Sequence, residues 1–195
     1  MSNHRFFYHG TQVPIHLSPD PYLEPSLSKG LDEGDPTVPH VFVTPDELCA
    51  CIFSLKTATL SVMSVTPEFS FAIYSRPPSS LGVGYVYKFD QMDYLPFEQT
   101  AARGQPTGKW VSFERLDTRT HPHLIVSGIE ELMERYGVQV YYTNMSGTST
   151  DIANELTDAA YLGNRAQLVS LSQQIRSGRL VHLNAVSGTN PVRLL

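Results

Sequence analysis

Short runs with the two-residue period of β-strands recur along the first 126 residues, and the period of α-helices is common in the remainder. Strands are predicted at residues 6–11, 40–43, 60–65, 69–74, 85–89, 110–116 and 123–126, and again at 138–142 and 180–183. Helices are predicted at residues 129–136, 152–162 and 166–175. A chain that is rich in strands first and in helices later is expected to have an α+β fold.

One helix is predicted among the early strands, from residue 44 to about residue 56. Thr44 can cap it, Pro45 suits the first helical position, and Glu47 stands three residues after the cap, as a capping box requires. One face of this helix is expected to be buried, because apolar residues recur at helical spacing. These residues are Leu48, Cys51, Ile52 and Leu55.

Two segments are rich in proline, glycine and polar residues and are predicted to be long loops: residues 12–35 and 90–107. Loops of this length are usually functional or disordered. Since the first loop follows directly on a His-Gly-Thr sequence, we expect it to cover a ligand. The change of pattern near residue 127 predicts a strand-rich core at residues 1–126 and an α/β extension at 127–195, packed on the core.

Composition narrows the choice of function. The chain has 195 residues, 41% of them hydrophobic and 17% charged, which is typical of a globular domain with a real core. Its formal net charge of −5 argues against a protein that coats nucleic acid nonspecifically. A local basic groove stays possible around Arg103, Lys109, Arg115 and Arg119.

The chain carries no sign of a membrane or secretory location. No apolar run approaches the roughly 20 residues of a membrane span, and the first residues lack the apolar stretch of a signal peptide. Cys49 and Cys51 are the only cysteines, and their spacing does not suit a disulfide, so we expect small core residues in a reducing compartment. We therefore expect a cytoplasmic protein with no membrane partner.

The strand at residues 6–11 is the first candidate for chemistry, because it carries His9 next to Gly10 and Thr11. We interpret it as a sheet edge that presents one histidine and exposed backbone to a ligand. Pro122 separates two further histidines, His121 and His123, but no cysteine or carboxylate beside them completes a metal site. No metal is expected.

Three short sequences, in this order and spacing, resemble the ADP-ribosyltransferase fold: YHGT at residues 8–11, VFVT at 41–44 leading into a helix, and GYVY at 84–87 with acidic residues soon after. The resemblance is to the branch with a His–Tyr–acid triad, which includes diphtheria-toxin-like enzymes and the small rifampin ADP-ribosyltransferases. GQPT at residues 104–107 is also similar to the rifampin enzymes. The similarity covers residues 5–126, in islands. It implies split antiparallel β-sheets flanked by helices, with 1–126 as the NAD-binding core and a C-terminal helical extension.

The resemblance assigns roles to particular residues. His9 matches the family histidine, which hydrogen-bonds a ribose hydroxyl of NAD, and Gly10 and Thr11 match its neighbours. Phe42 stands where the family has tyrosine, so packing against the nicotinamide ring is retained and the hydroxyl is lost. The predicted NAD-binding residues are Tyr8, His9, Gly10, Thr11, Phe42 and Thr44. Tyr74, Tyr85 or Tyr87 could supply the missing hydroxyl from a neighbouring strand.

The catalytic acid is left between several residues. Asp93 lies closest to the position of the rifampin enzymes' aspartate, and Glu114 is favoured if the chain follows the glutamate-using members; Glu98 is a further rival. A carboxylate there would stabilise the positive charge that develops on the sugar when NAD is cleaved. Each candidate also has a structural interpretation: His9 as a structural histidine, Phe42 as a core aromatic residue, and Asp93 as a turn residue.

The resemblance therefore implies an enzyme that transfers ADP-ribose from NAD, its co-substrate, to an acceptor. The extension at residues 127–195 exceeds what the small antibiotic-modifying members need, which favours a macromolecular acceptor and a toxin-like or defence-related role. Two alternatives stay open. One is an NAD glycohydrolase, with water as the acceptor. The other is a non-catalytic module that binds a nucleotide or a protein, which Phe42 favours.

Overall fold

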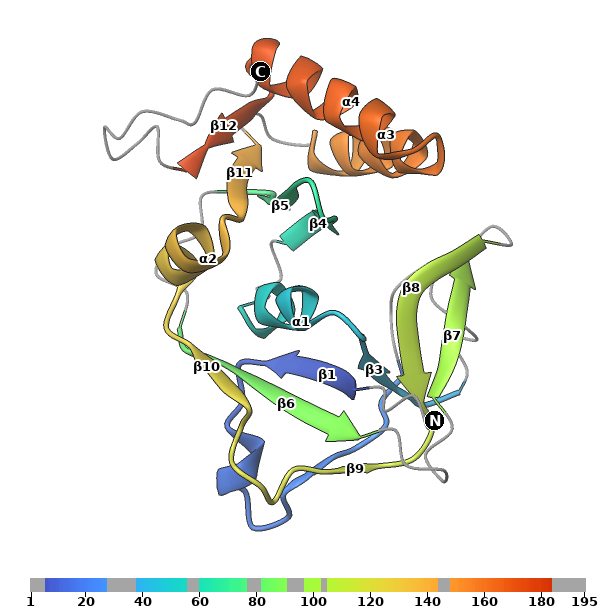
Figure 1. Ribbon diagram of the computed structural model, residues 1–195, viewed down its shortest axis with the longest axis vertical. Coiled ribbons are helices and arrows are strands. Elements are labelled where there is room, and N and C mark those ends of the chain that lie inside the picture. The colour runs from blue at the N-terminus through green and yellow to red at the C-terminus, as the bar shows by residue number, and fades with distance from the viewer. Residues whose placement is uncertain are drawn as a thin grey trace. The chain divides into compact units, whose positions relative to one another are not determined.

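The computed structural model describes residues 6–27, 38–55, 60–76, 82–102 without 91–96, 105–143 and 148–183, with backbone alone at 97–102 and 105–109. The fold is α+β, as the sequence pattern predicts (Figure 1). The chain divides into two compact units: residues 1–55 with 82–127, and residues 56–81 with 128–195. The boundary at 127/128 is one residue from the expected one, but residues 56–81, expected in the first part, belong to the second unit.

The first unit contains a three-stranded antiparallel sheet with the order β1-β6-β10. Its strands are β1 (Phe6–Thr11), β6 (Gly84–Asp90) and β10 (Leu124–Val126). β6 lies in the centre, so β1 has a sheet partner on one side only, and the prediction of a sheet edge at residues 6–11 is confirmed. His9 stands directly opposite Tyr87 in this pairing.

A second antiparallel sheet of the same unit has the order β3-β8-β7. It consists of β3 (Val41–Val43), β8 (Gln105–Ser112) and β7 (Phe97–Ala102). The prediction of an irregular segment at residues 90–107 is therefore wrong for β7 and the first part of β8. Pro106 lowered the strand signal there, although Ala102 and Gln105 form the last pair of β7 and β8.

Helix α1 (Glu47–Ser54) follows β3, but its N-cap differs from the prediction. Asp46 is the cap, and its carboxylate accepts a hydrogen bond from the Cys49 backbone N–H at 3.0 Å. Thr44 cannot start the helix because its backbone still pairs with Tyr8, in a bridge between strand ends. Its hydroxyl accepts instead from the Asp46 N–H at 3.1 Å. The predicted buried face is confirmed at Cys51, Ile52 and Leu55, whereas Leu48 is only half-buried; Ala50 and Ser54 are buried as well.

Asp46→Ala is expected to lower the free energy of unfolding by about 1 kcal/mol, because the Cys49 N–H loses its acceptor at the helix start. Urea unfolding followed by Trp110 fluorescence measures this, since Trp110 is the only tryptophan and lies in the first unit. Asp46→Asn keeps a side-chain oxygen at the cap and should stay close to wild type. An equal loss in both variants would contradict the capping role.

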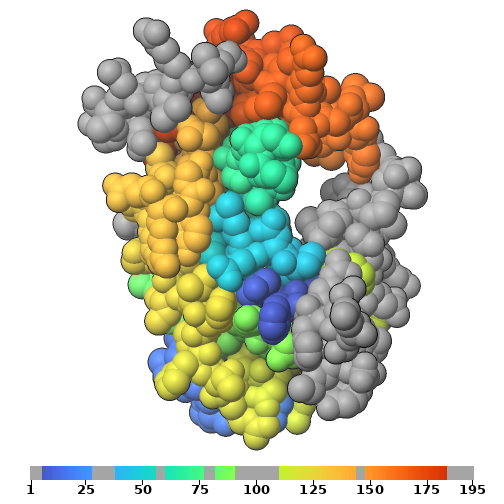
Figure 2. Space-filling view, in the orientation of Figure 1, coloured from blue at the N-terminus to red at the C-terminus, as the bar shows by residue number. Residues whose placement is uncertain are grey.

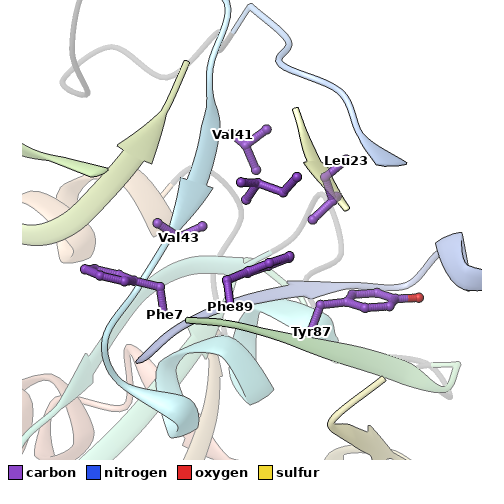
Figure 3. Packing of buried hydrophobic residues seen from close by; sticks show 7 residues of the cluster. Phe7, Leu23, Val41, Val43, Tyr87 and Phe89 are labelled. Atoms are coloured by element: carbon purple, nitrogen blue, oxygen red, sulfur yellow. The ribbon is translucent and has the colours of Figure 1, made fainter. Parts of the chain in front are cut away.

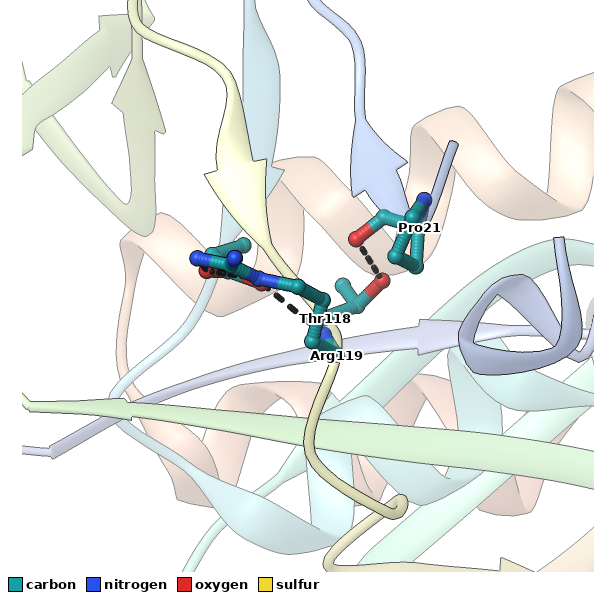
Figure 4. A network of polar contacts seen from close by, with 4 residues as sticks. Pro21, Thr118 and Arg119 are labelled. Atoms are coloured by element: carbon teal, nitrogen blue, oxygen red, sulfur yellow. Dashed lines mark hydrogen bonds and ion pairs between the residues drawn. The ribbon is translucent and has the colours of Figure 1, made fainter. Parts of the chain in front are cut away.

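Part of the predicted loop at residues 12–35 is ordered by distant partners. A 3₁₀ turn spans Ile15–Leu17, and the two-residue strand β2 (Tyr22–Leu23) pairs with β9 (Leu116–Asp117). Next to this pair, the Thr118 hydroxyl donates to the Pro21 carbonyl at 2.6 Å (Figure 4). The expectation of a loop without regular structure is therefore wrong at residues 15–17 and 22–23. That the segment covers a ligand stays a prediction, and residues 28–37 lie outside the described part.

The core of the first unit lies between its strands (Figure 3). Seven buried side chains form it, and they come from β1, β2, β3, β6 and β9. They are Phe7, Leu23, Val41, Val43, Tyr87, Phe89 and Leu116. The core therefore fixes β1, β3 and β6 relative to one another, and these are the strands that carry the candidate site.

The second unit is built on a sheet with the order β12-β11-β5-β4. Its strands are β4 (Leu60–Val65), β5 (Ser70–Tyr74), β11 (Gln139–Thr143) and β12 (Leu180–His182). β5 and β11 run parallel, so this sheet is mixed rather than antiparallel as expected. Both ends of each of these four strands lie within one residue of the predicted ends.

Three helices complete the second unit: α2 (Ile129–Tyr136), α3 (Ser149–Tyr161) and α4 (Asn164–Arg176). Gly137 ends α2 in the left-handed conformation, with φ of 66°, which explains the glycine at this position. α3 and α4 pack against each other as a helical hairpin (Figure 1). Within the described ranges, no helix is long and apolar enough to cross a membrane.

Candidate functional site

The β1-β6-β10 and β3-β8-β7 sheets of the first unit are joined by a bridge between Tyr8 of β1 and Thr44, the residue after β3. The Tyr8 N–H donates to the Thr44 carbonyl at 2.7 Å, and the Thr44 N–H donates to the Tyr8 carbonyl at 2.9 Å. If this pairing continued, Gly10 would face Phe42, but no such pair forms. We call the backbone of Gly10 and Phe42, which do not pair with each other, the open edge.

The backbone groups of Gly10 point to the open edge for a geometric reason. Successive residues of an antiparallel strand turn their N–H and C=O groups to opposite sides. Tyr8 turns its groups to Thr44, away from β6, and Gly10, two residues later, turns its groups the same way. Within the described part of the chain, neither the N–H nor the C=O of Gly10 has a hydrogen-bond partner.

His9 lies beside the open edge with a defined protonation state. Its Nδ1–H donates to the Phe42 carbonyl at 2.7 Å, since a carbonyl can only accept. Burial lowers the pKa of His9 below its usual value, and the bond to Phe42 opposes this only in part. The ring is therefore neutral at pH 7, and Nε2 is an acceptor without a partner among the described residues. One nitrogen orients the ring, and the other can bind a hydroxyl.

Phe42 contributes both its backbone and its ring to the site. Its carbonyl holds His9, while its half-buried ring packs edge-on against His40, with ring centroids 4.5 Å apart. Val41 and Val43, on either side, are buried in the core and fix the strand. The Phe42 carbonyl therefore holds His9, while its ring lies beside His40; an aromatic side chain stands at this position without the hydroxyl of the family tyrosine.

The side chains of two other predicted NAD-binding residues have other contacts. The Thr11 hydroxyl accepts a hydrogen bond from the Val13 N–H at 3.1 Å. The Thr44 side chain is buried, and its hydroxyl accepts from the Asp46 N–H. Both hydroxyls stabilise local turns, so these residues shape the backbone around the open edge.

Tyr8 lies close to a hydrogen-bonded pair, His123 and Glu47, that the sequence did not indicate. Its ring is 5.7 Å from that of His123, and His123 Nε2 lies 2.8 Å from a Glu47 carboxylate oxygen. Burial, and then the negative charge of Glu47, raise the pKa of Tyr8. No sequence pattern marks this group, because its members come from β1, α1 and the segment before β10.

The three candidate acids differ in where they lie relative to the open edge. Asp93 lies outside the described residues. Glu98 lies on β7, where its backbone pairs with Val111, and Val111 pairs in turn with Phe42, so the three residues form one row across the sheet. Glu114 is exposed and follows β8, in a turn that the Ser112 hydroxyl holds by donating to the Glu114 carbonyl. The register places Glu98 level with the open edge.

The three tyrosines that could supply the missing hydroxyl differ in burial and in hydrogen bonding. Tyr74 lies in the core of the second unit, fully buried, and burial raises its pKa to about 12. The Tyr87 hydroxyl contacts His16 Nδ1 at 2.8 Å and is buried as well. Tyr85 is partly exposed and stands opposite Thr11. Tyr85 is therefore the tyrosine whose position suits this role.

The described residues contain no group of three His, Cys, Asp or Glu side chains that could hold a metal ion. Both cysteines are free thiols; Cys51 is buried, and burial raises the pKa of Cys49 to about 12, which makes it a poor nucleophile. Comparison of the chain with protein-family models, curated proteins and solved structures finds no match. Function therefore has to be argued from the chemistry of the open edge.

Proposed function

We propose that the protein is an ADP-ribosyltransferase that transfers ADP-ribose from NAD to an acceptor, and that nicotinamide binds at the open edge. The observation that carries this proposal is the pair of unpartnered backbone groups of Gly10, next to the free Nε2 of His9. A strand edge of this kind offers one donor and one acceptor side by side. Its complement is a flat group with one acceptor and one donor, and the primary carboxamide of nicotinamide is such a group.

The neighbouring side chains fit the remainder of the ligand. Phe42 offers an aromatic surface for the nicotinamide ring, and His9 Nε2 can accept a hydrogen bond from a ribose hydroxyl. In the reaction, the bond between the nicotinamide nitrogen and ribose C1′ breaks with its electron pair going to nicotinamide. The acceptor nucleophile then forms a bond to C1′ and loses its proton to solvent or to a base. A carboxylate stabilises the positive sugar between these events.

We assign this carboxylate to Glu98 because of its row position, with Asp93, favoured by the family resemblance, and Glu114 as its rivals. Two other functions remain alternatives. Water in place of the acceptor would make the protein an NAD glycohydrolase. A module that binds a nucleotide or a protein without catalysis is favoured by Phe42, since the family tyrosine hydroxyl is missing.

His9→Asn tests the proposed site without disturbing the fold. The asparagine Nδ2–H can still donate to the Phe42 carbonyl, while the acceptor at Nε2 is lost. We expect thermal stability close to wild type and NAD affinity about tenfold weaker, the effect of one lost hydrogen bond. Isothermal titration calorimetry with NAD measures the affinity.

His121→Asn is the matched control, because His121 is an exposed histidine of the same unit and should leave NAD affinity unchanged. Absence of NAD binding to the wild-type protein would end both enzymatic proposals and leave the non-catalytic module. Release of free ADP-ribose at full rate with no acceptor present would favour the glycohydrolase over the transferase.

A further inference from the structure

The inner face of α4 is fixed to the second unit by buried polar side chains. Gln167 is almost fully buried; its amide donates to the Leu156 carbonyl, and it accepts from the Ser64 hydroxyl at 2.9 Å. Gln174, about two helical turns after Gln167, is also buried and donates to Glu155. With Leu171 buried between them, these contacts determine which face of α4 is left for solvent.

The outer face of α4 carries a linear stripe. Arg165 and Arg176 are 11 residues apart, which is close to three full turns, so both lie on one line about 16 Å long. Between them, at helical spacing, lie Leu168, Val169 and Ser172. Together with Gln173, these residues line a shallow groove of about 280 Å³. Figure 2 shows the hairpin of α3 and α4 as part of the molecular surface (orange).

Two properties of the stripe bear on what it could bind. Val169 is 51% exposed, so an apolar residue occupies the middle of the stripe. Arg165 and Arg176 are exposed and have no ion pair or hydrogen bond to a described residue, in a chain whose net charge is −5. Arg179, by contrast, pairs with Glu155 at 3.0 Å. The stripe thus combines an apolar centre with an unneutralised cation at each end.

We infer that this stripe is a docking surface for an acidic amphipathic helix of a partner protein. The groove is mixed in character, and a partner helix lying along it would place its own apolar side chains on Leu168 and Val169. Acidic residues 11 positions apart on that helix would reach Arg165 and Arg176. Nucleic acid fits less well, because a duplex carries one charge per about 1.7 Å and the stripe offers two cations and an apolar centre.

The test uses the full-length protein and a fluorescent synthetic helical peptide of about 18 residues, with leucines along one face and two glutamates 11 positions apart. We expect saturable binding by fluorescence anisotropy, without NAD. Arg165→Glu with Arg176→Glu should weaken it about tenfold, because two attractive pairs become repulsive. A peptide with arginines in place of the two glutamates should bind this variant better than the original peptide does.

Arg76→Glu is the control, since Arg76 is an exposed arginine of the same unit outside the groove, and it should bind like wild type. Equal binding of a peptide with the same composition in scrambled order would overturn the inference. So would stronger binding of a DNA duplex than of the peptide. Concentration-dependent dimerisation that the Arg165→Glu change abolishes would assign the stripe to a second copy of the chain instead.

Discussion

Replacing Gly10 by alanine is expected to destabilise the first unit by about 3 kcal/mol, at the upper end for an overpacked site. An added Cβ would lie 1.9 Å from the Ala50 carbonyl oxygen and 2.6 Å from the Ser54 nitrogen. Both are backbone atoms of α1, so no side-chain rotation can relieve the overlap, and the helix itself would have to move away from β1. For a chain of this length, the melting temperature should fall by roughly 10 °C.

Trp110 makes the measurement specific to the unit that contains Gly10. Its ring packs edge-on against Phe7 of β1, with centroids 5.3 Å apart, so its fluorescence follows the core of the first unit. Gly82→Ala is the matched control: no heavy atom lies within 4 Å of the added Cβ, and the change should stay within about 0.5 kcal/mol. Similar unfolding curves for the two variants would show that α1 does not pack closely on β1.

This packing changes how Gly10 is interpreted. From the sequence, the glycine suggested close approach of a ligand to the backbone. In the structure, the missing Cβ makes room for α1, while the N–H and C=O groups of the same residue face the open edge. Loss of NAD binding in Gly10→Ala would therefore not separate the two roles, which is why His9→Asn is the cleaner test of the site.

Most elements could be predicted from the sequence because their signals are local. Alternating aromatic residues marked β6, and helical spacing with a glycine at its end marked α2. β2 was not predicted, and β9 was reached only at Leu116, as the end of a strand predicted at residues 110–116. Each of the two strands has two residues and depends on pairing with a partner more than 90 positions away. The same limit applies to residues 56–81, whose place in the second unit depends on the pairing of β5 with β11.

The candidate site also has a part that local sequence predicts and a part that depends on distant contacts. His9, Gly10 and Phe42 could be proposed from short sequences, and the structure brings these three together. Whether a hydroxyl or backbone group is free depends on the partner it meets, and this could not be read from the sequence for Thr11, Thr44 or Tyr87. Which acid can face the site depends on the strand register, because a shift of one residue turns every side chain of a strand to the other face of the sheet.

Glu98→Gln is expected to lower the rate of nicotinamide release from NAD by about 10²–10³-fold, the usual loss when a group that stabilises transition-state charge is removed. Strands of a sheet lie about 4.8 Å apart, so the backbone of Glu98, two strands from Phe42 in the same row, is about 10 Å from it. The substitution keeps the size of the side chain and removes only its charge. Release is measured by chromatography after incubation with NAD and candidate acceptors.

The rival acids are compared in the same assay. Glu114→Gln should stay within about threefold of wild type, because Glu114 lies beyond the end of β8, in an exposed turn outside the row of Phe42. Asp93→Asn tests the acid that the family resemblance favours. A loss of nicotinamide release in this variant, with Glu98→Gln unaffected, would select Asp93 and refute Glu98, which the strand register favours. If all three variants turn over NAD as wild type does, charge stabilisation by these carboxylates is excluded, and another group has to stabilise the sugar.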